Sequence, residues 1–193
     1  MMVTIDQIKE LREKTGISIG QCKKALEEAG GDMEKAVVIL SKKGGDFAAK
    51  KSERTLKSGA IASYIHNSGK VGAMVELLCE TDFVAKNEEF TKLAYDIAMQ
   101  IAATNPTFTR KEDITDADRQ KAIAVFEEEV KDKPAEMREK ILEGKITSYF
   151  KDKVLVEQDF IKNPEVTITK LIEGAIHKFG ERMEVGKFVR FEV

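Results

Sequence analysis

The sequence is poor in the residues that build metal-binding or nucleophilic centres. Its 193 residues include only two cysteines and two histidines. Two cysteines cannot form a disulfide framework. A four-ligand zinc site would need Cys22, Cys79, His66 and His177 together, and they lack the close spacing typical of such sites. We therefore expect reduced thiols in a cytoplasmic protein that carries no metal and no cofactor.

Long apolar runs and an excess of one charge are also missing. No apolar stretch approaches the roughly 20 residues of a membrane span, and the first residues lack the basic start and apolar run of a secretory signal. The 32 basic and 34 acidic residues nearly cancel, leaving a net charge of -2. We therefore expect no membrane partner and no direct nucleic-acid partner. With 42% hydrophobic residues, the chain can bury a core.

The first forty-five residues are predicted to form three short helices. Thr4 with Gln7, and Ser18 with Gln21, fit the capping box, in which side chains bond the free amides of a helix's first turn. Asp32 suits the cap of the third helix. Glycines mark the expected breaks, at residues 15–16, 30–31 and 44–45. The pattern predicts a three-helix domain over residues 1–45.

A basic stretch follows these helices. Residues 42–57 contain six basic and two acidic residues. We interpret residues 46–57 as a basic linker between two acidic modules. A basic run of this kind is usually a solvated surface. Phe47 is its only aromatic residue for stacking on a base. The stretch also falls short of a phosphate-binding loop, because Lys50 stands where the second glycine is needed.

The remainder, residues 58–193, is predicted to be an α+β core. Two strand-like runs, residues 60–66 and 71–79, flank a hairpin turn. At the end of the chain, apolar residues alternate with charged ones from Val189 to Val193, and we expect the apolar face of this strand to be buried. Helices packed on one side of a small antiparallel sheet complete the predicted architecture.

The helices of this core follow from apolar residues at helical spacing. One long helix is predicted to stop before the Asn105-Pro106 pair. A helical hairpin is predicted over about residues 116–151, with Pro134 in the first turn of its second helix. A last helix is predicted over residues 168–179, with a stop at Gly180.

The residues do not form a recognisable catalytic set. With the hairpin turn at residues 67–70, Cys79 lies roughly 26 Å from His66, too far for a nucleophile pair. His177 lies between the apolar positions of its helix, and we expect it to be partly exposed rather than a base. Carboxylates are numerous, but none stands out as an acid–base couple. We predict that the chain is not an enzyme.

Residues 80–88, between the second strand and the long helix, allow two interpretations. In the first, Thr81 or Asp82 caps a helical turn while Phe83 and Val84 fill the junction of sheet and helix. In the second, Phe83 lies at a tip beside a helix start and serves as an aromatic anchor for a partner. Periodicity does not separate the two.

Several motifs, in order along the chain, resemble bacterial elongation factor Ts. The sequence TDFVAKN at residues 81–87 resembles the family's signature, as do LREKTG at residues 11–16 and QCKKAL at residues 21–26. Later segments are similar too: KILEGK, LVEQDF and FVRF at residues 140–145, 155–160 and 188–191. The likeness runs over essentially the whole chain.

The resemblance implies a guanine nucleotide exchange factor for elongation factor Tu in translation elongation. It implies that the first three helices form a ubiquitin-associated-like domain. It also implies that the partner is bound in its GDP-bound and nucleotide-free states. Phe83 would be the wedge near the partner's magnesium ion, Asp82 would shape the approach, and Thr81 and Val84 would support the turn.

The resemblance also implies a second contact, through the N-terminal helices. Arg12 and Lys23 match positions of the family's N-terminal contact surface. That surface often has two methionines where this chain has Ile19-Gly20. Ile19 keeps one apolar anchor, and Gly20 provides none.

The length resembles the short form of the family, which can form a homodimer. An exposed edge of a small sheet would suit such pairing. Two alternatives to the exchange factor stay open at this point. One is an adaptor that uses the ubiquitin-associated-like domain, and the other is a weak RNA-binding protein that uses the basic stretch.

Overall fold

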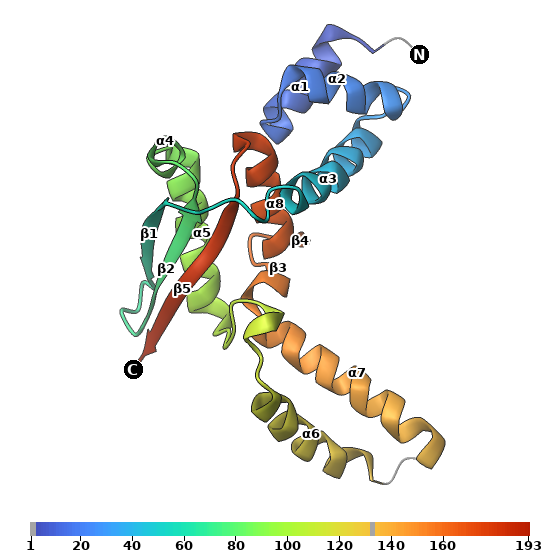
Figure 1. Ribbon diagram of the computed structural model, residues 1–193, viewed down its shortest axis with the longest axis vertical. Helices are drawn as coiled ribbons and strands as arrows, with labels where there is room; N and C mark the ends of the chain where they lie inside the picture. The colour runs from blue at the N-terminus through green and yellow to red at the C-terminus, as the bar shows by residue number, and fades with distance from the viewer. Residues whose placement is uncertain (1–2, 132–133) are drawn as a thin grey trace. The chain divides into compact units, whose positions relative to one another are not determined.

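The computed structural model describes residues 3–131 and 134–193 and confirms the α+β class (Figure 1). Contacts divide the chain into two compact units. The first contains residues 3–62, Glu76–Tyr95 and Thr169–Gly186. The second contains Ser63–Val75, the described part of Asp96–Ile168, and Lys187–Val193.

The three N-terminal helices are α1 (Ile5–Thr15), α2 (Ile19–Glu28) and α3 (Met33–Ala49). They form because each presents an apolar stripe to the other two, and these stripes share one buried cluster. Its buried members are Ile8, Leu11, Ile17, Cys22, Ala25, Leu26, Ala36 and Leu40.

Two of the three predicted helix caps form as expected. The capping box of Thr4 and Gln7 is complete, and Asp32 accepts a hydrogen bond from the backbone of Lys35. Ser18 does not make its box: its hydroxyl donates to the side chain of Gln21 at 2.9 Å and bonds no backbone amide. The pairing of Ser18 with Gln21 is therefore present without the bond to the backbone that would complete the box.

The predicted break at residues 44–45 is wrong, because α3 continues through both glycines to Ala49. A Cβ atom on Gly44 would lie 3.5 Å from the backbone oxygen of Glu173, in helix α8 (Ile168–Phe179). A Cβ atom on Gly45 would lie 3.3 Å from the Glu173 carboxylate. Neither glycine has the positive φ that commonly ends a helix, and both lie inside α3 where it faces Glu173. The first residues of the predicted basic linker, 46–49, are therefore helical.

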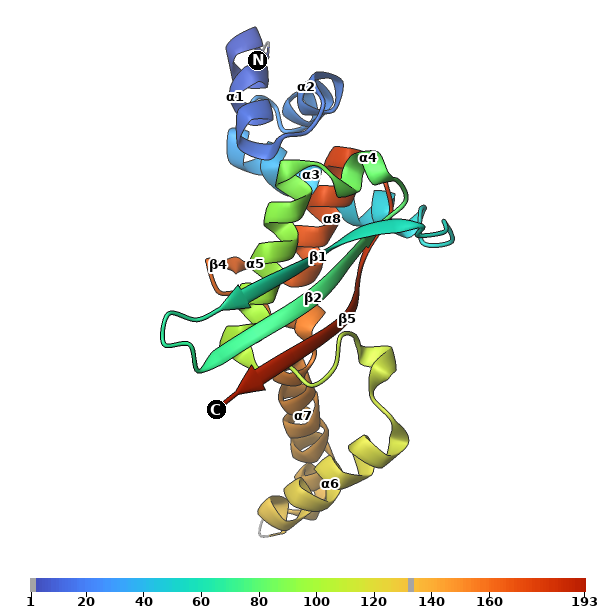
Figure 2. The ribbon, with the colours of Figure 1, turned by 90° about the vertical axis from the view of Figure 1, so that its left-hand side faces the viewer.

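Three strands form the main sheet, in the order β1 (Ser58–Ile65), β2 (Val71–Cys79) and β5 (Met183–Glu192), as Figure 2 shows. The predicted hairpin joins β1 to β2. At its turn the backbone amide of His66 donates to Val71 at 2.8 Å, and Gly69 has a φ of 68°.

Strand β5 is longer than predicted, and its apolar end faces outward. Met183 and Val185 are buried, whereas Val189, Phe191 and Val193 are exposed. The side chain of Arg190 instead points toward helix α5 (Glu88–Thr104), where its Nε donates to the carbonyl of Ala102 at 3.0 Å. Neighbouring side chains on a strand point to opposite faces. The expectation that Val189 and its apolar neighbours lie on a buried face is therefore wrong.

The other helices lie close to their predicted bounds. Helix α5 ends one residue before Asn105, which has a φ of 48°. The hairpin consists of α6 (Asp116–Val130) and α7 (Ala135–Lys153). Phe150 of α7 and Val154, which follows this helix, join a buried cluster with Ile114 and Ala122. Helix α8 stops before Gly180, whose φ is 74°.

Several short elements have no clear sequence signal. They are two 3-10 helices, η1 (Lys111–Asp113) and η2 (Leu155–Glu157), and a small antiparallel pair, β3 (Asp159–Phe160) and β4 (Asn163–Thr167). The buried amide of Gln100 holds this region together. It donates to Gln158 and to the backbone of Asp159, and it accepts from the backbone of Ile161 at 2.9 Å.

Candidate functional site

The segment that follows β2 forms a single helical turn, α4 (Asp82–Ala85). Thr81 is its cap: the backbone of Thr81 is extended, and its hydroxyl accepts from the amide of Val84 at 3.4 Å. The backbone bond from Ala85 to Thr81, at 3.1 Å, closes the turn. This part of the first interpretation, a hydroxyl-capped turn, is confirmed.

Phe83 does not fill the junction of sheet and helix. Its side chain is 86% exposed, whereas the following Val84 and Ala85 are buried. In so short a helix, consecutive side chains must point in different directions, so Val84 fills the junction and Phe83 projects into solvent. The result is an aromatic side chain at the tip of a turn whose base is packed.

Asp82 is fixed by its own contacts beside this tip. Its carboxylate accepts a hydrogen bond from the hydroxyl of Ser58, the first residue of β1, at 2.6 Å. The ammonium group of Lys86 lies 4.0 Å away on the next turn. Asp82 therefore places a negative charge next to Phe83.

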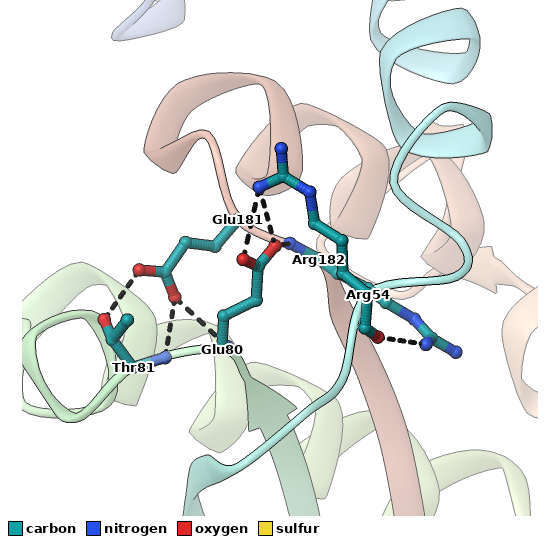
Figure 3. A network of polar contacts seen from close by, with 5 residues as sticks. All are labelled: Arg54, Glu80, Thr81, Glu181 and Arg182. Carbon is teal, nitrogen blue, oxygen red and sulfur yellow. Dashed lines mark hydrogen bonds and ion pairs between the residues drawn. The ribbon is translucent and has the colours of Figure 1, made fainter.

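The strongest partner of this segment was not evident from the sequence. Glu181, in the turn between α8 and β5, accepts hydrogen bonds from the backbone of Glu80 and from both the backbone and the hydroxyl of Thr81 (Figure 3). The two sites are 100 residues apart in the chain. No short-range signal marks such a pairing; a glutamate after the glycine that ends a helix is otherwise an ordinary surface residue.

Glu80 belongs to the same network and is held ionised. Burial of its carboxylate alone would raise the pKa. Hydrogen bonds from the backbone of Arg182 and from the guanidinium of Arg54 outweigh this effect, so the pKa of Glu80 is lowered. Glu80 therefore stays charged at neutral pH.

The nearby cysteine is structural. Burial raises the pKa of the Cys79 thiol, and the negative charges of Glu181 and Asp82 raise it further. The thiol also donates to the carbonyl of Thr81 at 3.3 Å. Because the thiolate is the reactive form, this cysteine supports the base of the turn and is not a nucleophile.

The three candidate residues of the N-terminal helices are all exposed. Arg12 lies in the last turn of α1. Ile19, the first residue of α2, is 53% exposed. Lys23 lies one turn further along α2 and makes an exposed ion pair with Glu27 at 3.8 Å. Ile19 and Lys23 share one face of the helix because they are four residues apart.

Much of the basic stretch is engaged within the chain. The ammonium group of Lys51 lies 4.7 Å from the centre of the Phe47 ring, and Phe47 also packs against the ring of His177. Lys43 pairs with Glu28, and Arg54 pairs with Glu80. These contacts engage the Phe47 ring and three basic side chains, which RNA binding through this stretch would need.

The expectation of a partly exposed His177 is wrong. The side chain is buried on α8, and its Nδ1 atom has no hydrogen-bond partner. Burial lowers the pKa of His177, and the charge of Lys43 lowers it further. Phe47 on α3 covers the ring, a contact that the helical pattern of α8 alone does not reveal.

Among the described residues, we find no group of three or more histidine, cysteine or acidic side chains that could hold a metal ion. Within the same part of the chain, no helix is both long and apolar enough to span a membrane.

One family model and several full-length relatives, all with the same name, match this chain. Residues 18–193 match the family model described as elongation factor TS. A protein of Thermodesulfovibrio yellowstonii named elongation factor Ts is 50% identical, over 100% of this chain and 97% of that protein. Proteins of the same name from Carboxydothermus hydrogenoformans and Thermotoga petrophila are each 47% identical over 100% of this chain, and over 89% and 97% of their own lengths.

Proposed function

Because the chain belongs to the elongation factor Ts family, we propose that it is a guanine nucleotide exchange factor for elongation factor Tu. It would act in the cytoplasm during translation elongation, and it would work by binding rather than by catalysis. The observation that supports this proposal best is the position of Phe83, exposed at the tip of a turn whose neighbouring residues are buried.

We propose that Phe83 acts as a wedge near the partner's magnesium ion. Magnesium requires near-ideal octahedral coordination by oxygen ligands, so a small displacement of one ligand weakens the binding of the metal and GDP together. Asp82 shapes the approach through its charge, while Thr81 and Val84 hold the turn. This mechanism needs no reactive side chain.

Exchange of this kind is a coupling of two binding equilibria. The factor must bind the nucleotide-free partner more tightly than the GDP-bound partner, and nucleotide must weaken the factor's binding by the same ratio. A 1000-fold ratio corresponds to about 4 kcal/mol. One well-buried aromatic anchor with its surrounding contacts can supply a difference of this size.

A second contact is proposed for the N-terminal helices. Ile19 would be its apolar anchor, because it is exposed at the start of α2. Arg12 and Lys23 would add positive charge around it. This surface, proposed as part of a ubiquitin-associated-like domain over residues 1–45, would provide affinity, whereas the Phe83 turn would provide the difference between nucleotide states.

The proposal is tested by the release of fluorescent GDP from purified elongation factor Tu. We expect the wild-type chain to accelerate release strongly, and Phe83→Ala to lose most of the acceleration. The variant should fold normally, because the side chain is exposed and its removal leaves no cavity. Unchanged acceleration by a folded Phe83→Ala would contradict the wedge.

We further propose that two copies of the chain associate through the outward face of the sheet. Ile65, Met74, Val189 and Phe191 leave an apolar surface exposed there. Pairing would bury these side chains, at roughly 25 cal/mol for each Å² of apolar area removed from water. Sedimentation should give a dimer for the wild type and a monomer for Phe191→Glu; a wild-type monomer at working concentration would contradict this.

A further inference from the structure

Glu181 is joined to the start of the Phe83 turn by three hydrogen bonds. Its Oε2 accepts from the backbone amides of Glu80 and Thr81, at 3.1 and 3.0 Å, and its Oε1 accepts from the Thr81 hydroxyl at 2.6 Å (Figure 3). Hydrogen bonds to an ionised carboxylate are among the stronger ones in proteins. One side chain thus fixes two consecutive backbone positions directly after β2.

The Thr81 hydroxyl passes this constraint on to α4. While it donates to Glu181, its oxygen accepts from the amide of Val84. A hydroxyl has one hydrogen and two lone pairs, so it can make both bonds at once. Glu181 therefore selects the hydroxyl orientation that leaves a lone pair for the cap, and it acts on the helical turn that carries Phe83.

A reciprocal set of bonds closes the network from the other side. The Glu80 carboxylate accepts from the backbone amide of Arg182 at 2.6 Å and from the guanidinium of Arg54 at 3.2 Å. The guanidinium of Arg182 in turn donates to the carbonyl of Arg54. Residues 80–81 and 181–182 thus bond to each other in both directions, with Arg54 as a third anchor (Figure 3).

Phe83 needs such support because it has little packing of its own. Its side chain is exposed, so the direction in which it projects depends on the backbone of the turn. Ordering a residue costs conformational entropy, and a turn that is ordered before binding does not lose this entropy from its affinity.

We propose that Glu181 is a positioning residue for nucleotide exchange, which acts through Thr81 to hold the Phe83 turn in its binding conformation. The proposal rests on the proposed function of Phe83. Glu181 itself is not proposed to contact the partner.

The first test measures the order of residue 83 without any partner. The chain contains no tryptophan, so Phe83→Trp introduces a single fluorescent reporter at the tip. In this background, Glu181→Ala should increase the amplitude of the fast phase of the tryptophan anisotropy decay about twofold. The reason is that residues that lose their tertiary bonds become mobile on the nanosecond scale. Glu181→Gln keeps a side chain of the same size that can still form neutral hydrogen bonds. Its fast-phase amplitude should lie between those of Glu181 and Glu181→Ala.

The second test measures GDP release from elongation factor Tu with Phe83 in place. Glu181→Ala should lower the maximal rate at saturating factor roughly tenfold or more, since misplacement of a contacting group by about 1 Å can cost up to 10²-fold. The concentration for half-maximal rate should change much less, because Arg12, Ile19 and Lys23 still bind. Thr81→Val should lower the maximal rate by a similar factor. Thr81→Ser, which keeps the hydroxyl, should retain most of the wild-type rate.

Glu173→Ala is the matched control. This glutamate lies on α8 and accepts a hydrogen bond from Lys170 at 2.7 Å, rather than from the Phe83 turn. It should leave both the anisotropy and the exchange rate at the wild-type level. All variants are compared at a temperature at which circular dichroism shows each of them to be folded.

The outcomes separate this proposal from the wedge itself. If Phe83→Ala loses exchange while Glu181→Ala changes neither readout, the positioning role is overturned and the wedge stands. Increased mobility in Glu181→Ala with an unchanged exchange rate also overturns it. If Phe83→Ala keeps full exchange, the wedge fails and the role of Glu181 in exchange fails with it, while the anisotropy still shows whether Glu181 orders the turn.

Discussion

Phe83 and Ile19 are both exposed apolar side chains near the start of a helix and close behind a hydroxyl residue, yet the two helix starts are held differently. Thr81 caps α4 and is itself bonded to Glu181, 100 residues away. The Ser18 hydroxyl bonds the side chain of Gln21, three residues away, and caps no backbone amide. A hydroxyl residue shortly before an exposed apolar residue therefore occurs in two settings. At Phe83 the helix start is held by a long-range hydrogen bond, and at Ile19 it is not.

The comparison predicts unequal roles for the two side chains in exchange. Phe83→Ala should lower the second-order rate constant for GDP release by roughly 30-fold or more, as expected for a hot-spot aromatic worth about 2 kcal/mol. Ile19→Ala should lower it by about tenfold or less, mainly through a higher half-saturating concentration, because this contact contributes to affinity alone. Full rate titrations of both variants give the two parameters. A larger loss for Ile19→Ala would reverse the assignment.

The two hydroxyls should also differ in their effect on stability. Thr81→Val removes a cap that bonds a backbone amide, so we expect a loss of about 1 kcal/mol in the free energy of unfolding. Ser18→Ala removes only a contact between two exposed side chains, and its effect should stay within about 0.5 kcal/mol. Denaturant titration of the two variants measures the difference. Equal losses would mean that the helix starts are held alike.

A smaller effect is expected where α3 packs on α8, the region that joins the N-terminal helices to the rest of the first unit. The pKa of His177 is lowered in the fold, so the unfolded chain takes up this proton at a higher pH than the native protein does. Stability should therefore be complete above about pH 6.5, the ordinary pKa of histidine, and should fall as the pH decreases below it.

His177→Leu removes the titrating group together with its unpartnered nitrogen. We expect the unfolding free energy of this variant to depend less on pH between about 6.5 and 5 than that of the wild type. Thermal unfolding across that range provides the measurement. An identical pH profile in the variant would show that His177 does not control the effect.

Features governed by neighbours in the sequence were predictable. The bounds of α6 and α8 follow from helical spacing and, for α8, from the glycine stop at Gly180. The hairpin of β1 and β2 follows from its turn residues. The TDFV motif directed attention to Phe83, although its exposure could not be derived from periodicity, because an aromatic residue at a helix start can face either way.

Features governed by distant contacts were not predictable. A pair of glycines is typical of a helix end, but Gly44 and Gly45 lie inside α3, where it faces Glu173 of α8. Val189 and Phe191 have the alternation of a half-buried strand, and the pattern does not reveal which face the helix covers. Glu181 has no motif at all, since its role depends on a turn that lies a hundred residues earlier.

Phe83 is proposed to promote GDP release by displacing the partner's magnesium ion, and the most direct test is whether its effect depends on that ion. GDP release is measured with the wild type and with Phe83→Ala, first in millimolar magnesium and then in excess chelator. Without the ion the wedge has nothing to displace, so the wild-type advantage should shrink from roughly 30-fold to within about threefold. The same advantage with and without magnesium would contradict the account.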